Sequence, residues 1–169
     1  MGKRRTSREN ALQILFELEF NDADLDRVLA GYWNSKKSEG QVQEYANWLV
    51  RGIVARKDEV DALIQGNSKH WRISRMAFVD RNILRIAVFE LLEEKLIAPA
   101  IVINEAIEIA KRYSSDEAAV FVNGVLDAVR KKLAKTEPRQ ESIEANTNER
   151  SKQTSKQRTV RSTGRAKKN

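Results

Sequence analysis

The stretch from residue 80 to residue 95, DRNILRIAVFELLEEK, is the part around which we expect the rest of the chain to pack. At 100° per residue its apolar side chains cover nearly the whole circumference of a helix, leaving polar groups at the two ends and at Arg85. They are Ile83, Leu84, Ile86, Ala87, Val88, Phe89, Leu91 and Leu92. A helix that is apolar on most sides is a buried one, and this stretch is too short and too charged to span a bilayer. The pattern therefore predicts a buried central helix with Asp80 as its N-cap.

Three helices are predicted in the first part of the chain. Thr6 and Glu9 have the spacing of a capping box, and an apolar stripe at helical spacing follows to about Phe20. Asp22 or Asp24 can start a second helix. A third, long helix begins near residue 40 and continues to residue 65, where Gly66 and Asn67 end it.

The second half of the chain is helical as well. A short helix is expected after Trp71, and Pro99 is well placed in the first turn of a later helix whose inward face includes Ile101. Ser114 and Glu117 are spaced as another capping box, which opens a last helix running to about Leu133. The sequence thus predicts an all-α fold of roughly seven helices.

The charge of the chain is unevenly placed. The net charge is +7, yet residues 1–137 hold 22 basic and 21 acidic side chains, whereas residues 138–169 hold 9 basic and 3 acidic ones. From residue 137 onward there are almost no large apolar residues, so we expect a disordered basic tail that attracts polyanions without sequence preference. The chain has no cysteine, which excludes disulfides and thiolate sites. No signal peptide or membrane span is recognisable, so a cytoplasmic protein is expected.

A second concentration of positive charge lies at the start, where Lys3, Arg4, Arg5 and Arg8 have no acid among them. The positive end of a helix dipole favours acids, so these cations are either a solvated basic terminus or a site for an external anion. Gly124, in the middle of the last helix, indicates a close helix contact or the approach of a ligand.

Metal chemistry has little support in the sequence. Glu105 and Glu108 are a carboxylate pair, but no second such pair or Glu-x-x-His motif accompanies them, and the single His70 has no companion at ligand spacing. We therefore expect no metal site and no cofactor.

Four segments carry a resemblance to a known family. In order they are KRRTSRENALQILFELEF, DRNILRIAVFELL, PAIVINEAIEIAKRYSS and FVNGVLD, and together they resemble the NusB family of bacterial transcription antitermination factors from residue 3 to residue 134. The resemblance implies two small helical bundles packed across each other. We accordingly expect an N-terminal bundle at 1–66, a C-terminal bundle of the same compact domain at 67–136, and the tail at 137–169.

The resemblance also implies a function without catalysis. Proteins of this family bind the boxA element of nascent ribosomal RNA transcripts together with the ribosomal protein NusE, in an RNA polymerase antitermination complex. The positions that match the RNA-binding residues of the family are Lys3, Arg4, Arg5, Arg8, Phe16, Phe121 and Asn123. Arginines would contact phosphates and exposed aromatic rings would stack on unpaired bases, so single-stranded RNA is the expected ligand.

Other interpretations of the chain stay open to different degrees. Val120 stands where relatives commonly place a lysine, which removes one expected phosphate contact. Asp80 and Glu117 are candidate positions at the rim of the NusE surface, and the pattern does not decide between monomer and homodimer.

A related fold occurs in ribosomal RNA cytosine methyltransferases, but this chain has neither a cofactor domain nor a cysteine. A protein-binding adaptor with Phe121 in the core is the main alternative.

Overall fold

The computed structural model describes residues 2–136, and the predictions made for the tail at 137–169 lie outside this range. Met1–Ala134 form one compact unit. The described residues form α-helices and one short 3₁₀ helix, with no strand, so the predicted all-α fold is confirmed. The helices are α1 (Lys3–Leu18), α2 (Leu25–Ser35), α3 (Gly40–Ala55), α4 (Lys57–Gly66), η1 (Ile73–Arg75), α5 (Phe78–Glu93), α6 (Pro99–Tyr113) and α7 (Asp116–Thr136).

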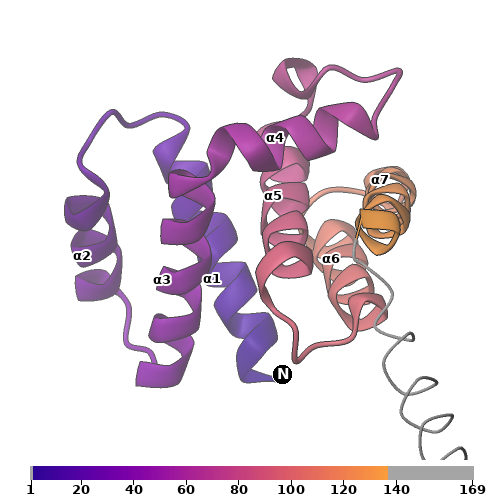
Figure 1. Ribbon diagram of the computed structural model, residues 1–169. Helices are drawn as coiled ribbons and strands as arrows, with labels where there is room; N and C mark the ends of the chain where they lie inside the picture. The colour runs from indigo at the N-terminus through magenta and orange to yellow at the C-terminus, as the bar shows by residue number, and fades with distance from the viewer. Residues whose placement is uncertain (1, 137–169) are drawn as a thin grey trace, which may run out of the picture. The chain divides into compact units, whose positions relative to one another are not determined.

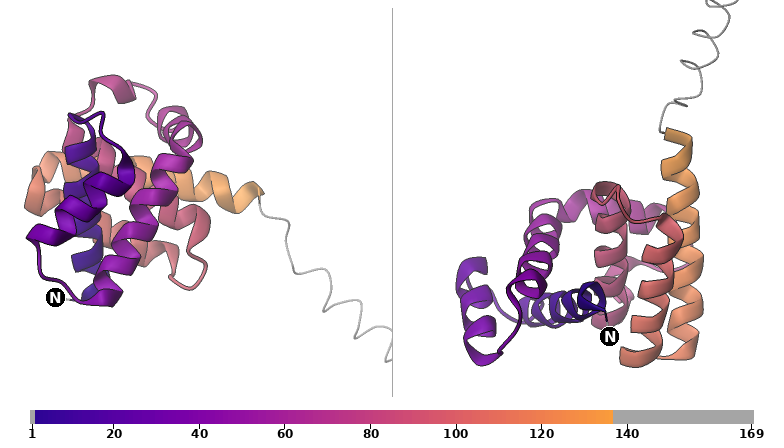
Figure 2. Two further views of the ribbon diagram at one scale, coloured as in Figure 1. Left: turned by 90° about the vertical axis from the view of Figure 1, so that its left-hand side faces the viewer. Right: turned by 90° about the horizontal axis from the view of Figure 1, so that it is seen from below.

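Helix α5 is the centre of the compact unit, as the pattern predicted. All residues from Asn82 to Leu91 are buried, and α5 contacts α1, α3, α4 and α6 (Figure 1). On one side α1 packs against α2 and α3. On the other side α6 and α7 lie side by side, which both views make clear (Figure 1, Figure 2). The division into bundles at residue 66 stays a prediction, because α5 joins both groups of helices.

Two predicted helix starts are wrong. Helix α5 begins two residues before Asp80, with Ala77 as N-cap, and the Asp80 carboxylate instead lies in the first turn. Helix α1 begins at Lys3, so Thr6 is inside it and its hydroxyl donates to the Gly2 carbonyl oxygen at 3.4 Å. Glu9 accepts a hydrogen bond from Arg112 instead of closing a capping box. In both cases the helix extends further towards its N-terminus than the first plausible cap.

The long third helix of the prediction is two helices. Helix α3 ends at Ala55, and Arg56, with φ −117° and ψ 27°, turns the chain into α4. The Arg56 guanidinium bonds Glu59 on α4 and Glu93 on α5, which stabilises the turn. The change of direction lays α4 across the end of α5 (Figure 1). The predicted end of this segment at Gly66 is confirmed.

The caps of the remaining helices agree with the sequence in part. Asp24 caps α2, and Pro99 occupies the first turn of α6, as predicted. The cap of α7 is Ser115 and not Ser114, because the Ser115 hydroxyl accepts from the Ala118 amide at 3.0 Å. Ile101 was predicted to face inward and is instead 52% exposed.

The glycines that matter for packing differ from the expected one. No atom of a neighbouring helix lies within 4 Å of a side chain placed at Gly124, so no close helix contact explains that residue. The close contact is instead at Gly52, where α3 approaches α5, since a Cβ there would lie 2.0 Å from the Phe89 ring. Gly124 is exposed on α7, and the approach of a ligand there stays a prediction.

Candidate nucleic-acid interface

The cations at the start of α1 are all paired with carboxylates from other elements. The pairs are Lys3 with Glu39 before α3 (2.7 Å), Arg4 with Glu94 after α5 (3.1 Å), Arg5 with Glu105 on α6 (2.7 and 2.8 Å) and Arg8 with Glu90 on α5 (2.9 and 3.0 Å). The basic start of the helix is therefore neutralised within the fold. Three of the four pairs remain partly exposed, and only these cations can reach an external anion without a change in the core.

The fourth pair lies in the interior. Arg8 is 3% exposed and Glu90 1%, and the Tyr45 hydroxyl of α3 donates a third hydrogen bond to the same carboxylate. Burial, reinforced by the charge of Glu90, raises the pKa of Tyr45. A guanidinium in this position joins α1 to α5, cannot lose its partner without leaving a buried charge, and has no surface to offer a phosphate. The predicted contact between Arg8 and RNA has no support in this placement.

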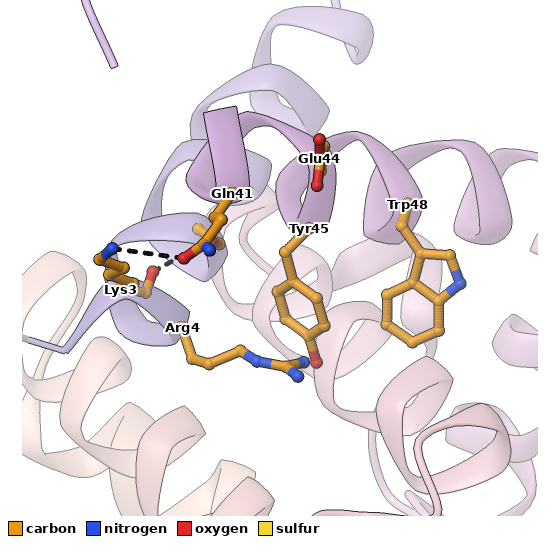
Figure 3. A pocket seen from close by; sticks show the side chains of 7 residues that line it. Lys3, Arg4, Gln41, Glu44, Tyr45 and Trp48 are labelled. Carbon is orange, nitrogen blue, oxygen red and sulfur yellow. Dashed lines mark hydrogen bonds between the residues drawn. The ribbon is translucent and has the colours of Figure 1, made fainter. Parts of the chain in front are cut away.

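A pocket of about 400 Å³ opens beside the first turn of α1 (Figure 3). Lys3 and Arg4 line one side, and the rings of Tyr45 and Trp48 project from α3 on the other. The two rings stack with centroids 5.1 Å apart, and the Arg4 guanidinium lies 3.9 Å from the centre of the Tyr45 ring. Flat aromatic faces beside cations are the combination that binds unpaired bases.

Tyr45 and Trp48 were not among the candidate residues of the sequence. Tyr45 lies on the apolar stripe of its helix, although its ring reaches the surface beside Arg4. The sequence did contain a signal for this pair: two large aromatic residues three positions apart on one helix lie on the same face.

Phe16 lies at the opposite end of α1, about 20 Å along the helix axis from Lys3. It is exposed and packs with two further exposed rings, Phe20 at 5.2 Å and Phe78 of α5 at 6.3 Å. The fold therefore does not bring Phe16 together with the arginines, but it does leave the ring accessible.

Phe121 on α7 is partly buried against the core, and its exposed edge meets Trp71 with ring centroids 6.1 Å apart. Asn123 is exposed, but it is two residues further on, about 200° around the helix from Phe121. The two predicted RNA contacts on α7 thus face different directions. Of the proposed partner residues, Glu117 is exposed and Asp80 is partly buried, with one carboxylate oxygen that has no hydrogen-bond partner.

The part of the chain that the structure covers gives no support for a metal site or for a membrane-spanning helix. Glu105 is bound to Arg5 and Glu108 to Lys111, and no three potential metal ligands cluster within residues 2–136. None of the helices there is long and apolar enough to cross a membrane.

Comparison with known proteins identifies the family. The sequence model of the NusB family matches residues 5–131, which include most of α1, the central helix and most of α7. The chain belongs to the NusB family. Family membership makes it a transcription antitermination protein, and the predicted resemblance is confirmed.

Relatives of the NusB family match along nearly their whole length. The transcription antitermination protein NusB of Sorangium cellulosum is 40% identical over 137 residues, which are 81% of this chain and 98% of the relative. That of Anaeromyxobacter dehalogenans strain 2CP-1 is 46% identical over 131 residues, 76% of this chain and 92% of the relative.

Solved structures of the family share the fold. NusB from T. maritima superimposes with a TM-score of 0.70 at 39% identity, covering 78% of this chain and 92% of the other. A crystal structure of the antitermination factors NusB and NusE in complex with double-stranded RNA contains a similar chain, with a TM-score of 0.70, 31% identity, and coverage of 78% and 98%.

Proposed function

We propose that this NusB-family protein binds boxA-type single-stranded RNA together with NusE, as a subunit without catalytic activity in an RNA polymerase antitermination complex. A structure of similar fold contains NusB, NusE and RNA in one complex, which supports both partners. The RNA in that complex is double-stranded, so a duplex belongs among the ligands that are tested.

The observation that carries the proposal is the pocket at the start of α1, where cations and partly exposed aromatic rings meet. Lys3 and Arg4 have about half of their side chains exposed there, and Arg5 lies beside them on the same turn. Partly exposed ion pairs contribute only about 0 to 1 kcal/mol, so RNA phosphates can replace the carboxylates of Glu39, Glu94 and Glu105 at small cost. Phosphates would thereby gain charge-assisted bonds to guanidinium groups.

The proposed RNA-binding set combines the cations at the pocket with the positions that the family resemblance assigns. Lys3, Arg4 and Arg5 contact phosphates, while Phe16 and Phe121 stack on unpaired bases. Asn123, on another face of α7, reaches a different part of the RNA, and Arg8 acts from the core by fixing α1. Asp80 and Glu117 remain the proposed rim of the NusE surface.

The first experiment compares a boxA-type RNA, a base-scrambled RNA and a boxA duplex, each with and without NusE. Preference for single-stranded boxA that strengthens with NusE is the expected result. Equal binding to all three RNAs, with no gain from NusE, would contradict the proposal.

Variants separate an RNA-binding protein from an adaptor that attracts polyanions without preference. The internal pairing of all four α1 cations is the observation that favours the adaptor. We expect Arg5→Ala and Phe121→Ala each to reduce boxA affinity while both variants stay folded with the helicity of the wild type. Arg130→Ala is the matched control, because Arg130 is a partly exposed arginine on α7 whose acid, Asp127, lies on its own helix. Unaltered boxA binding in both test variants would favour the adaptor.

A further inference from the structure

We propose that the turn between α4 and η1 together with η1 itself, residues 67–75, is a second RNA-contacting surface that nothing in the sequence pattern singled out. Trp71 forms with Phe121 a platform for an unpaired base, and Lys69, Arg72 and Arg75 hold the neighbouring phosphates. This inference rests on the proposed function, since it assumes that the ligand is RNA.

Trp71 is an exposed ring on a fixed backbone. It is 60% exposed, yet its amide donates to the Ser68 carbonyl at 3.0 Å and its carbonyl accepts from the Gln65 side-chain amide at 3.3 Å. The buried Ser68 hydroxyl lies within hydrogen-bond distance of the carbonyl oxygens of both Ile64 and Trp71. These bonds tie the turn to the end of α4. A ring held in place before binding loses little conformational entropy when a base stacks on it.

The Trp71 ring does not stand alone. Its centroid lies 6.1 Å from that of Phe121, at an interplanar angle of 67°. This edge contact joins the turn to α7 and leaves a face of the indole open. The platform therefore combines one aromatic that the family resemblance assigned to RNA with one that it did not.

The charge around Trp71 differs from that at the start of α1. Residues 67–79 contain Lys69, Arg72 and Arg75 and no aspartate or glutamate. These three side chains are exposed, and none makes an ion pair or hydrogen bond with another residue in the range 2–136. The cations of α1, by contrast, each have a carboxylate. Phosphates can approach the turn without displacing an internal partner.

An acid on α7 neighbours Phe121. Glu117 lies one helical turn before Phe121 on α7 and is exposed. Its negative charge would repel a phosphate placed over the start of α7. The backbone of the bound strand therefore runs along residues 69–75, and only a base reaches Phe121. Cations without internal partners beside an exposed indole ring are what an RNA strand binds. A surface for a protein partner would instead have the exposed ring at the centre of an apolar patch, so we favour RNA.

The test uses the full chain with NusE and the boxA-type RNA. Trp71→Ala is expected to weaken RNA binding about 5-fold or more, the typical effect of removing a stacked ring, while Trp71→Phe retains most of the affinity. Leu96→Ala is the matched control, because Leu96 is an exposed apolar residue in the connection between α5 and α6 and lies outside the proposed surface. Stacking should also quench tryptophan fluorescence in the wild type more than in Trp71→Phe.

The phosphate contacts are tested separately. A variant with Lys69, Arg72 and Arg75 all replaced by Gln should lower the slope of log affinity against log salt by about two, close to 0.7 for each lost contact with a single strand. Melting should be unchanged, since none of these side chains has an internal partner.

The outcomes distinguish this inference from the proposed function. If Arg5→Ala weakens boxA binding while Trp71→Ala and the triple variant do not, the second surface is wrong and the proposed function stands. If Trp71→Ala weakens binding to NusE but not to RNA, the turn is a protein surface and the inference is overturned. If the wild type shows no preference for boxA, both fail together.

Discussion

The ion pair between Arg5 and Glu105 gives the sharpest prediction about RNA binding. Two hydrogen bonds of 2.7 and 2.8 Å join the side chains, with 33% of Arg5 and 21% of Glu105 exposed. If Arg5 binds a phosphate, Glu105 competes for the same guanidinium. Glu105→Gln keeps the size of the side chain and removes the competing charge, so it should strengthen RNA binding.

The expected gain follows from the exposure of the pair. Partly exposed ion pairs are worth about 0.3 to 1 kcal/mol, and 1.4 kcal/mol corresponds to a tenfold change in affinity. Glu105→Gln should therefore raise boxA affinity about two- to fivefold. The gain should shrink as salt is added, because added ions screen the competing carboxylate as well as the phosphate.

The assay is fluorescence anisotropy of a labelled boxA-type RNA at two salt concentrations. Glu108→Gln is the matched control, since it removes the same charge from the same helix but Glu108 bonds Lys111 and not α1. An equal gain in both variants would indicate a general charge effect. No gain, or a loss, in Glu105→Gln would refute the idea that this carboxylate competes with RNA.

Three further predictions concern stability and packing. Gly52→Ala should destabilise the protein by about 1 to 3 kcal/mol in chemical denaturation, because its Cβ would overlap the Phe89 ring. Gly124→Ala should instead stabilise it by up to about 1 kcal/mol, since nothing lies near that position, and a simultaneous loss of RNA affinity would show that a ligand approaches there. The hydrogen bond from Arg5 lowers the pKa of Glu105, so the stability advantage of the wild type over Glu105→Gln should be present above about pH 4.3 and be lost as the pH falls through the lowered pKa. A difference that stays constant from neutral to acidic pH would contradict this last prediction.

The helices could be predicted from sequence because their apolar residues recur at helical spacing. The break at Arg56 could not, since Ala55, Arg56 and Lys57 include neither glycine nor proline and the stripe continues on both sides. The break coincides with contacts that no local pattern shows: Arg56 bonds a residue on α5, 37 positions later in the sequence.

The residue types of the candidate site could be predicted from sequence, but the acids that pair with its cations could not. The sequence showed cations at the start of α1, but the acids that neutralise them come from up to 100 positions away. A signal for Arg8 did exist, because it precedes Ala11, Leu12 and Leu15 at spacings of three, four and seven and so lies on the apolar face. Glu90 is the matching signal, because an acid within the most apolar helix indicates a buried carboxylate with which a buried arginine can pair.

The buried bond between Arg8 and Glu90 also sets the direction in which the surface of α1 faces. Turning α1 by one residue would rotate it by about 100° and withdraw the guanidinium from the carboxylate. Leaving a buried charge unpaired in this way typically costs about 3 to 5 kcal/mol, so a single azimuth of the helix is strongly preferred. Lys3, Arg4 and Arg5 thus take part of their orientation from a contact in the core, and a substitution at Glu90 would weaken the anchoring of the outer side chains without changing any of them.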